Sequence, residues 1–146
     1  MEEKYKEKLE MKIKKIALVV VMMANIFFCL LINFSEILSG VSIGSKNIIV
    51  SIVYLVVWIL IILLSSYLKS KKLLKLFLGY WILNLVLYFF VTLLLKFEIY
   101  ISILVLLVVV FIGPMQGIYL SNSLVIISII GVLMSIFIAY FIRKTP

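Results

Sequence analysis

The chain consists of long apolar runs separated by short polar or charged breaks. Three of the runs cover residues 16–38, 48–68 and 73–95. Each has about the 20 residues that a helix needs to cross roughly 30 Å of hydrocarbon. The segments SGVSIGSKN at 39–47 and KSKKLLK at 69–75 lie around the second run. This pattern predicts three transmembrane helices.

The last apolar stretch carries no charge between Ile99 and Ile142, and it is too long for one span. A break at Gly113–Gly117 would leave a short first span, because proline removes an N–H and clashes with the preceding turn. A break at Ser121–Ser123 gives spans 99–120 and 123–142, with Pro114 kinking the first. We favour this second division, which predicts a bundle of five transmembrane helices. Four spans plus a re-entrant segment within 99–142 is the alternative.

Composition supports a membrane assignment. Hydrophobic residues make up 66% of the chain and charged residues 14%, whereas soluble domains have roughly 45–50% and about 25%. A soluble fold of 146 residues could not bury so much apolar side chain. We therefore expect an all-α integral membrane protein with a single membrane domain over 16–142 and a short tail at 143–146.

The N-terminal segment 1–15 is charged, and within it one face is apolar. Tyr5, Leu9, Ile13 and Ile16 fall within an arc of about 80° on a helix. This spacing favours an amphipathic helix at the membrane interface, with a solvated, partly frayed tail as the alternative. The run after it exceeds the 7–15 residues of a signal-peptide core, so we expect a retained helix.

Basic residues predict the orientation of the chain. The net charge is +8, and lysines gather at 4–15 and at 69–75, on the same side of the membrane. The positive-inside rule makes this side cytoplasmic, in contact with anionic lipid. Arg143 and Lys144 fall outside with five spans and inside with four. We expect no nucleic-acid partner, since no recognition fold accompanies the charge. The preference for Lys over Arg, together with only three Ala, suggests an AT-rich bacterial genome, so we expect a bacterial cytoplasmic membrane.

Several chemistries lack their side chains. The sequence has no His and no Asp, and Cys29 is its single Cys. Zinc sites and Ser-His-Asp or Cys-His catalysis need these residues together. The sequence therefore predicts no catalytic set, no cofactor, no metal site and no enzymatic activity.

Polar and small residues form stripes at helical spacing within the spans. The candidate intramembrane residues are Asn25, Cys29, Asn33 and Glu36 in the first span, Trp58 in the second, Trp81, Asn84 and Tyr88 in the third, Pro114 in the fourth, and Ser128, Gly131 and Ser135 in the last. We interpret them as packing seams between helices. The alternative is that they line a site or pathway. We expect the central amides of Asn25 and Asn84 to find partners, for example each other, since an unpaired amide there is costly.

Glu36 is the one ionisable residue well inside an apolar run. It lies about 13 Å from the middle of its span, at 1.5 Å per residue. That depth favours an interfacial residue, whereas a coupling carboxylate of a transporter is expected near the midplane. The overall prediction is a small accessory, regulatory or immunity-type subunit that docks to a larger membrane protein. The alternative is a small transporter or channel that works as a homo-oligomer.

Overall fold

The computed structural model describes residues 2–39, 44–97, 107, 109–111, 113–118 and 123–145, without the side chains of 35–39, 95, 116, 123 and 124. Its long helices are α1 (Glu2–Ser39), α2 (Ser45–Tyr67), α3 (Lys71–Lys96) and α5 (Ser123–Lys144), and Gly113–Ile118 form the short 3-10 helix η1. The described part of the chain consists of these helices and short connections, without a strand, and each long helix is long and apolar enough to cross a membrane.

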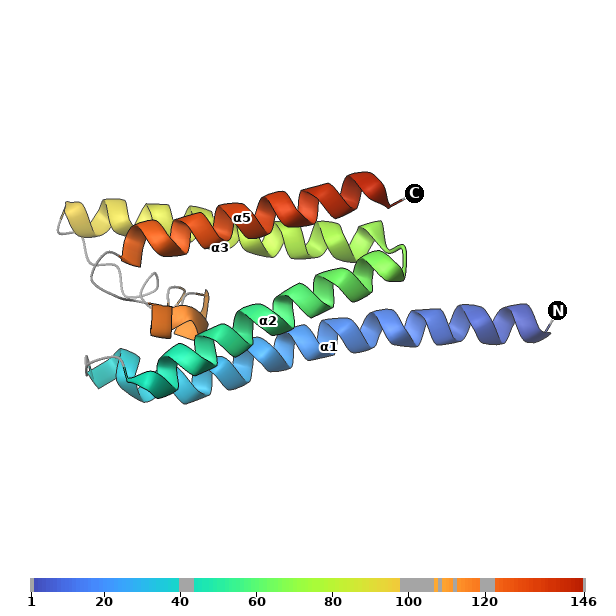
Figure 1. Cartoon of the computed structure of the whole chain (residues 1–146), viewed down its shortest axis with the longest axis horizontal. Helices are drawn as coiled ribbons and strands as arrows, with labels where there is room; N and C mark the ends of the chain where they lie inside the picture. The colour runs from blue at the N-terminus through green and yellow to red at the C-terminus, as the bar shows by residue number, and fades with distance from the viewer. Residues whose placement is uncertain are drawn as a thin grey trace.

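The helices form an elongated bundle of two pairs (Figure 1). Helix α1 packs against α2, and α3 packs against α5. Helix η1 lies between the two pairs at one end of the bundle, where it contacts α1 and α2. Both termini lie at the opposite end, which we call the terminal end; the end with η1 is the far end.

A tight turn at the terminal end joins α2 to α3. The N–H of Lys69 donates to the carbonyl of Ser66 at 2.9 Å, and the N–H of Ser70 donates to that of Ser65 at 3.1 Å. These are the two hydrogen bonds of a Schellman cap, which requires a left-handed residue at its first position beyond the helix. Lys69 occupies that position with φ 49°. The turn keeps α2 and α3 antiparallel neighbours.

The region around Pro114 differs from the kinked α-helix that the sequence favoured. Residues 107 and 109–111 are helical, but Gly113–Ile118 form a 3-10 helix. The 3-10 helix has a physical reason. Pro114 cannot donate an N–H, and side chains of α1 and α2 donate hydrogen bonds to the carbonyls of Gly113 and Pro114. Helix α5 begins at Ser123, where the predicted fifth span begins. Among the described residues four helices could span a membrane, so a fifth span is not confirmed.

Basic side chains are concentrated at the terminal end. The first turns of α1, the turn between α2 and α3, and the end of α5 all meet there (Figure 1). Every basic residue except Lys46 and Lys96 belongs to these segments or to the first two turns of α3. With four spans Arg143 and Lys144 join the other basic residues, and the conflict expected from five spans disappears.

Candidate functional site

Among the described residues, the most extensive polar cluster lies at the far end of the bundle, around η1. Asn33 of α1 is fully buried, and its Nδ2 donates to the carbonyls of Gly113 at 3.1 Å and Pro114 at 3.4 Å. Ser51 of α2 donates its hydroxyl to the Pro114 carbonyl at 3.1 Å and accepts the N–H of Gly117 at 2.9 Å. Two helices thus hold η1 through its backbone groups, which compensates for hydrogen bonds that a regular helix would make internally.

Asn47 completes this cluster from the first turn of α2. Its Nδ2 donates to Oδ1 of Asn33 at 3.1 Å, and its Oδ1 accepts the N–H of Gly44 at 3.2 Å. The side chain therefore closes the start of α2 and also ties α2 to α1. We call Asn33, Asn47 and Ser51 the polar clamp. All three are buried.

Gly117 brings η1 into direct contact with the backbone of α2. A Cβ at this position would overlap the carbonyl group of Asn47 and crowd the nitrogen of Ile48. Only glycine allows this approach. The segment Gly113–Gly117, considered from the sequence as a possible break in the apolar stretch, therefore also brings one glycine into close helix contact. Three members of this site are not among the candidate residues predicted from the sequence: Asn47, which was expected in a loop, Ser51 and Gly117.

A second polar pair lies closer to the middle of α1. Asn25 Nδ2 donates to the carbonyl of Tyr54 at 3.2 Å, and the Cys29 sulfur lies 3.6 Å from Asn25 Oδ1. Asn84 instead donates to the carbonyl of Tyr80 in its own helix at 3.0 Å. The two central asparagines therefore each find a partner but do not bind each other. Oδ1 of Asn84 has no partner within the described residues.

Aromatic side chains fill the interior between α2 and α3. Trp58 is fully buried and stacks on Tyr80 with a centroid separation of 4.9 Å. Its edges meet Phe77 at 5.6 Å and Trp81 at 5.5 Å, and the hydroxyls of Tyr54 and Tyr80 lie 2.9 Å apart. We call these five residues the aromatic plug. Next to it, a void of about 10 Å³ is bordered by Trp81, Asn84 and Met115. That volume is about the minimum for one water molecule.

The predicted small-residue stripe of α5 lies on its α3-facing side. A Cβ on Gly131 would lie 2.6 Å from a methyl of Leu85, so this glycine permits close packing of the two helices. Ser135 donates its hydroxyl to the carbonyl of Gly131 at 2.8 Å, within its own helix. Gly131 therefore contributes to the packing of α5 on α3, and the Ser135 hydroxyl is satisfied within α5.

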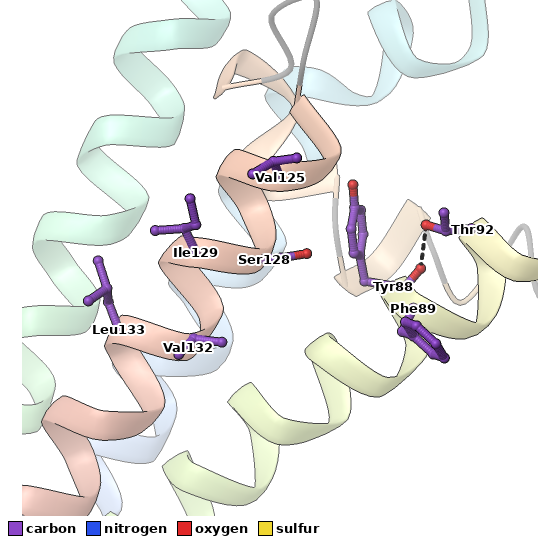
Figure 2. A pocket seen from close by; sticks show the side chains of 8 residues that line it. All are labelled: Tyr88, Phe89, Thr92, Val125, Ser128, Ile129, Val132 and Leu133. Carbon is purple, nitrogen blue, oxygen red and sulfur yellow. Dashed lines mark hydrogen bonds between the residues drawn. The ribbon is translucent and has the colours of Figure 1, made fainter.

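Beyond this contact the two helices diverge into a groove (Figure 2). The groove has a volume of about 490 Å³ and is lined by Tyr88, Phe89, Thr92, Val125, Ser128, Ile129, Val132 and Leu133. Tyr88 stands between α3 and α5, and Ser128 points from α5 into the same space. The Thr92 hydroxyl donates to the carbonyl of Tyr88 at 2.8 Å. An apolar surface with a few hydroxyls near one end suits an amphipathic ligand.

Two predictions about chemistry bear on the site. Glu36 belongs to α1, but its side chain lies outside the described part of the structure, and with it the prediction of an interfacial role. Within the described residues, no three His, Cys, Asp or Glu side chains are close enough to hold a metal ion.

Comparison of the chain with models of protein families, with curated proteins and with solved structures finds no match.

Proposed function

We propose that the chain is a four-span protein of a bacterial cytoplasmic membrane with both termini in the cytoplasm. There it acts as a non-enzymatic accessory subunit that docks to a larger membrane protein through α1. The orientation is supported by the basic residues of the terminal end, which the positive-inside rule assigns to the cytoplasm. Lys46 and Lys96 then face the opposite side.

The observation that carries the accessory role is the exposed seam of α1. Six apolar side chains along this face expose between 47% and 59% of their surface: Leu9, Ile13, Ile16, Val20, Met23 and Phe27. They follow one another at alternating steps of four and three residues, which is the spacing of a coiled-coil seam. We call these six residues the α1 seam.

The seam is informative where it leaves the apolar run. Leu9 and Ile13 lie among charged neighbours, including Lys8, Glu10 and Lys12. The membrane span therefore does not account for apolar residues at these two positions. On the opposite face, α1 buries Leu18 and Asn25 against the bundle. Since α1 is one continuous helix from Glu2 to Ser39, the seam runs unbroken from the charged segment into the span. A partner helix that leaves the membrane beside α1 would cover it.

The aromatic plug supports docking over transport by a single chain. Trp58, Trp81 and Tyr54 are each fully buried and occupy the centre of the bundle. A substrate path through this interior would have to displace their rings, at a cost of several kcal/mol. A transport pathway would therefore have to form between copies of the chain.

Site-specific photo-crosslinking tests the proposal. A photoreactive phenylalanine analogue is introduced at Ile13, at Phe27 or at Phe28, and crosslinked products are identified by mass spectrometry. Phe27 and Phe28 are adjacent and similarly exposed, at 56% and 61%, but point about 100° apart around α1. Phe28 is therefore the matched control.

We expect Ile13 and Phe27 to crosslink to the same larger membrane protein, and Phe28 to crosslink to lipid. Crosslinks from Phe27 to a second copy of the chain would refute the accessory role and favour an oligomeric transporter. Equal protein crosslinking from Phe27 and Phe28 would show that the α1 seam is not a specific surface.

A further inference from the structure

The groove between α3 and α5 opens onto the outer surface of the bundle. Its lining includes residues whose side chains are largely exposed, among them Phe89 at 69%, Val125 at 62% and Leu133 at 60%. In a bilayer these residues face hydrocarbon. Water gains no stabilisation in an apolar space of this kind, since it needs two to four polar partners. An apolar chain from the surrounding lipid is therefore the natural occupant.

The groove spans about one leaflet. From Val125 to Leu133 it follows α5 for roughly 12 Å at 1.5 Å per residue. Half of the hydrocarbon core is about 15 Å thick. Since α5 begins at Ser123 at the far end of the bundle, the groove starts near that membrane surface and ends at about the midplane. Its dimensions fit one acyl chain that enters from the far side.

One basic residue of α3 follows the groove-lining residues at the end of the helix. Lys96 is exposed and lies one turn beyond Thr92 at the end of α3. At 100° per residue it falls between Thr92 and Phe89 around the helix axis, so it shares their face. Apart from Lys96, the far end has Lys46 as its basic residue, and Lys46 belongs to the first turn of α2. Positive charge is scarce at this end, and one of its two lysines lies one helical turn beyond the groove-lining Thr92, on the same face of α3.

We infer that the α3–α5 groove binds an anionic phospholipid of the far leaflet, with one acyl chain in the groove and the phosphate at Lys96. Charge complementarity selects the headgroup, because a lysine near the membrane surface attracts an anionic lipid. Apolar contact with Val125, Ile129 and Val132 holds the chain. This site is independent of the α1 seam, which lies on a helix that packs against α2 and η1.

Native mass spectrometry of the purified chain tests the inference directly. The protein is released from detergent after incubation with phosphatidylglycerol or with phosphatidylcholine of the same acyl chains, and bound lipid is counted per chain. Lys96→Gln removes the headgroup contact, with Lys46→Gln as its matched control at the same end. Val132→Trp fills the groove, with Val56→Trp as its control, because Val56 is a similarly exposed valine of α2.

The wild-type chain should retain one phosphatidylglycerol and prefer it over phosphatidylcholine. Lys96→Gln should lower that preference roughly three- to tenfold, the effect of one lysine near a membrane surface. Lys46→Gln and Val56→Trp should leave binding unchanged, and Val132→Trp should reduce binding of both lipids. Equal effects of the two lysine substitutions, or unchanged binding in Val132→Trp, would overturn the inference. A dimer lost on Val132→Trp would assign the groove to a second copy instead. Since no partner protein is present, these results do not depend on the accessory role.

Discussion

Gly117 offers the sharpest test of the contact between η1 and α2, because a single methyl group at this position should displace η1. In Gly117→Ala the new Cβ would overlap the backbone of Asn47. Backbone cannot rotate away as a side chain does, so η1 has to move off α2. Forced repacking of this kind typically costs about 1–3 kcal/mol.

The displacement also breaks hydrogen bonds of the polar clamp. The N–H of Gly117 loses Ser51 at 2.9 Å, and Ser51 loses the carbonyl of Pro114 at 3.1 Å. Hydrogen bonds between membrane helices contribute about 0.6 kcal/mol on average and about 1.7 at most. Together with repacking, the free energy of unfolding should fall by about 2–4 kcal/mol, a large fraction of the 5–15 kcal/mol typical of a domain.

Gly79→Ala is the matched control. No atom lies within 4 Å of a Cβ at Gly79, which is an exposed position of α3. Alanine is favoured over glycine in a helix by up to about 1 kcal/mol, so this variant should be as stable as the wild type or slightly more stable. Unfolding in mixed micelles with rising dodecyl sulfate, followed by the fluorescence of the buried Trp58 and Trp81, measures both variants. A Gly117→Ala variant as stable as Gly79→Ala would refute the close approach of η1 and α2.

Three further substitutions test the packing by the same unfolding assay. Asn33→Leu should cost about 1–2 kcal/mol, because it removes the hydrogen bonds of Asn33 to Asn47 and to the carbonyls of Gly113 and Pro114. Asn84→Leu should cost less, since Asn84 bonds only within its own helix; equal losses would contradict the clamp. Trp58→Ala should lower the free energy of unfolding by about 3–5 kcal/mol through the cavity it leaves in the aromatic plug, while Ile52→Ala at an exposed position should change it little. Lys69→Gly should raise the stability by roughly 0.5–1 kcal/mol, because the residue has φ 49°, and a loss of stability would argue against the Schellman turn.

Hydrophobic length and helical periodicity were enough to predict the class, a helical protein whose helices are long and apolar enough to cross a membrane. Asn25 and Asn33 share one face of α1, and Trp58 and Trp81 lie on the polar and aromatic stripes of α2 and α3; the structure buries all four. The reason is that hydrophobic length and spacing depend on the membrane and on local geometry alone. Such features are visible in one sequence.

The region around η1 could not be predicted in the same way. The stretch from Ile99 to Ile142 is uncharged, so no charged residue within it marks a membrane boundary. Whether Pro114 kinks a long helix or sits in a short 3-10 helix depends on Asn33, Ser51 and Asn47, which are distant in sequence and supply hydrogen bonds across the bundle. Partner choice for Asn25 and Asn84 depends likewise on how the helices are placed in three dimensions. The Gly113–Gly117 spacing was the one local signal of close packing there.

The four-span arrangement with both termini in the cytoplasm is the claim on which the account depends most, and cysteine accessibility tests it directly. In a Cys29→Ala background, single cysteines are placed at Lys4, Lys46 and Arg143 and labelled in intact cells with a membrane-impermeant maleimide. Cys29 is buried, so its removal gives a clean background at small cost. The account predicts labelling of Lys46→Cys alone, with Lys4→Cys and Arg143→Cys labelled only after the cells are opened. Labelling of Arg143→Cys in intact cells would place the C-terminus outside, establish five spans and contradict the account.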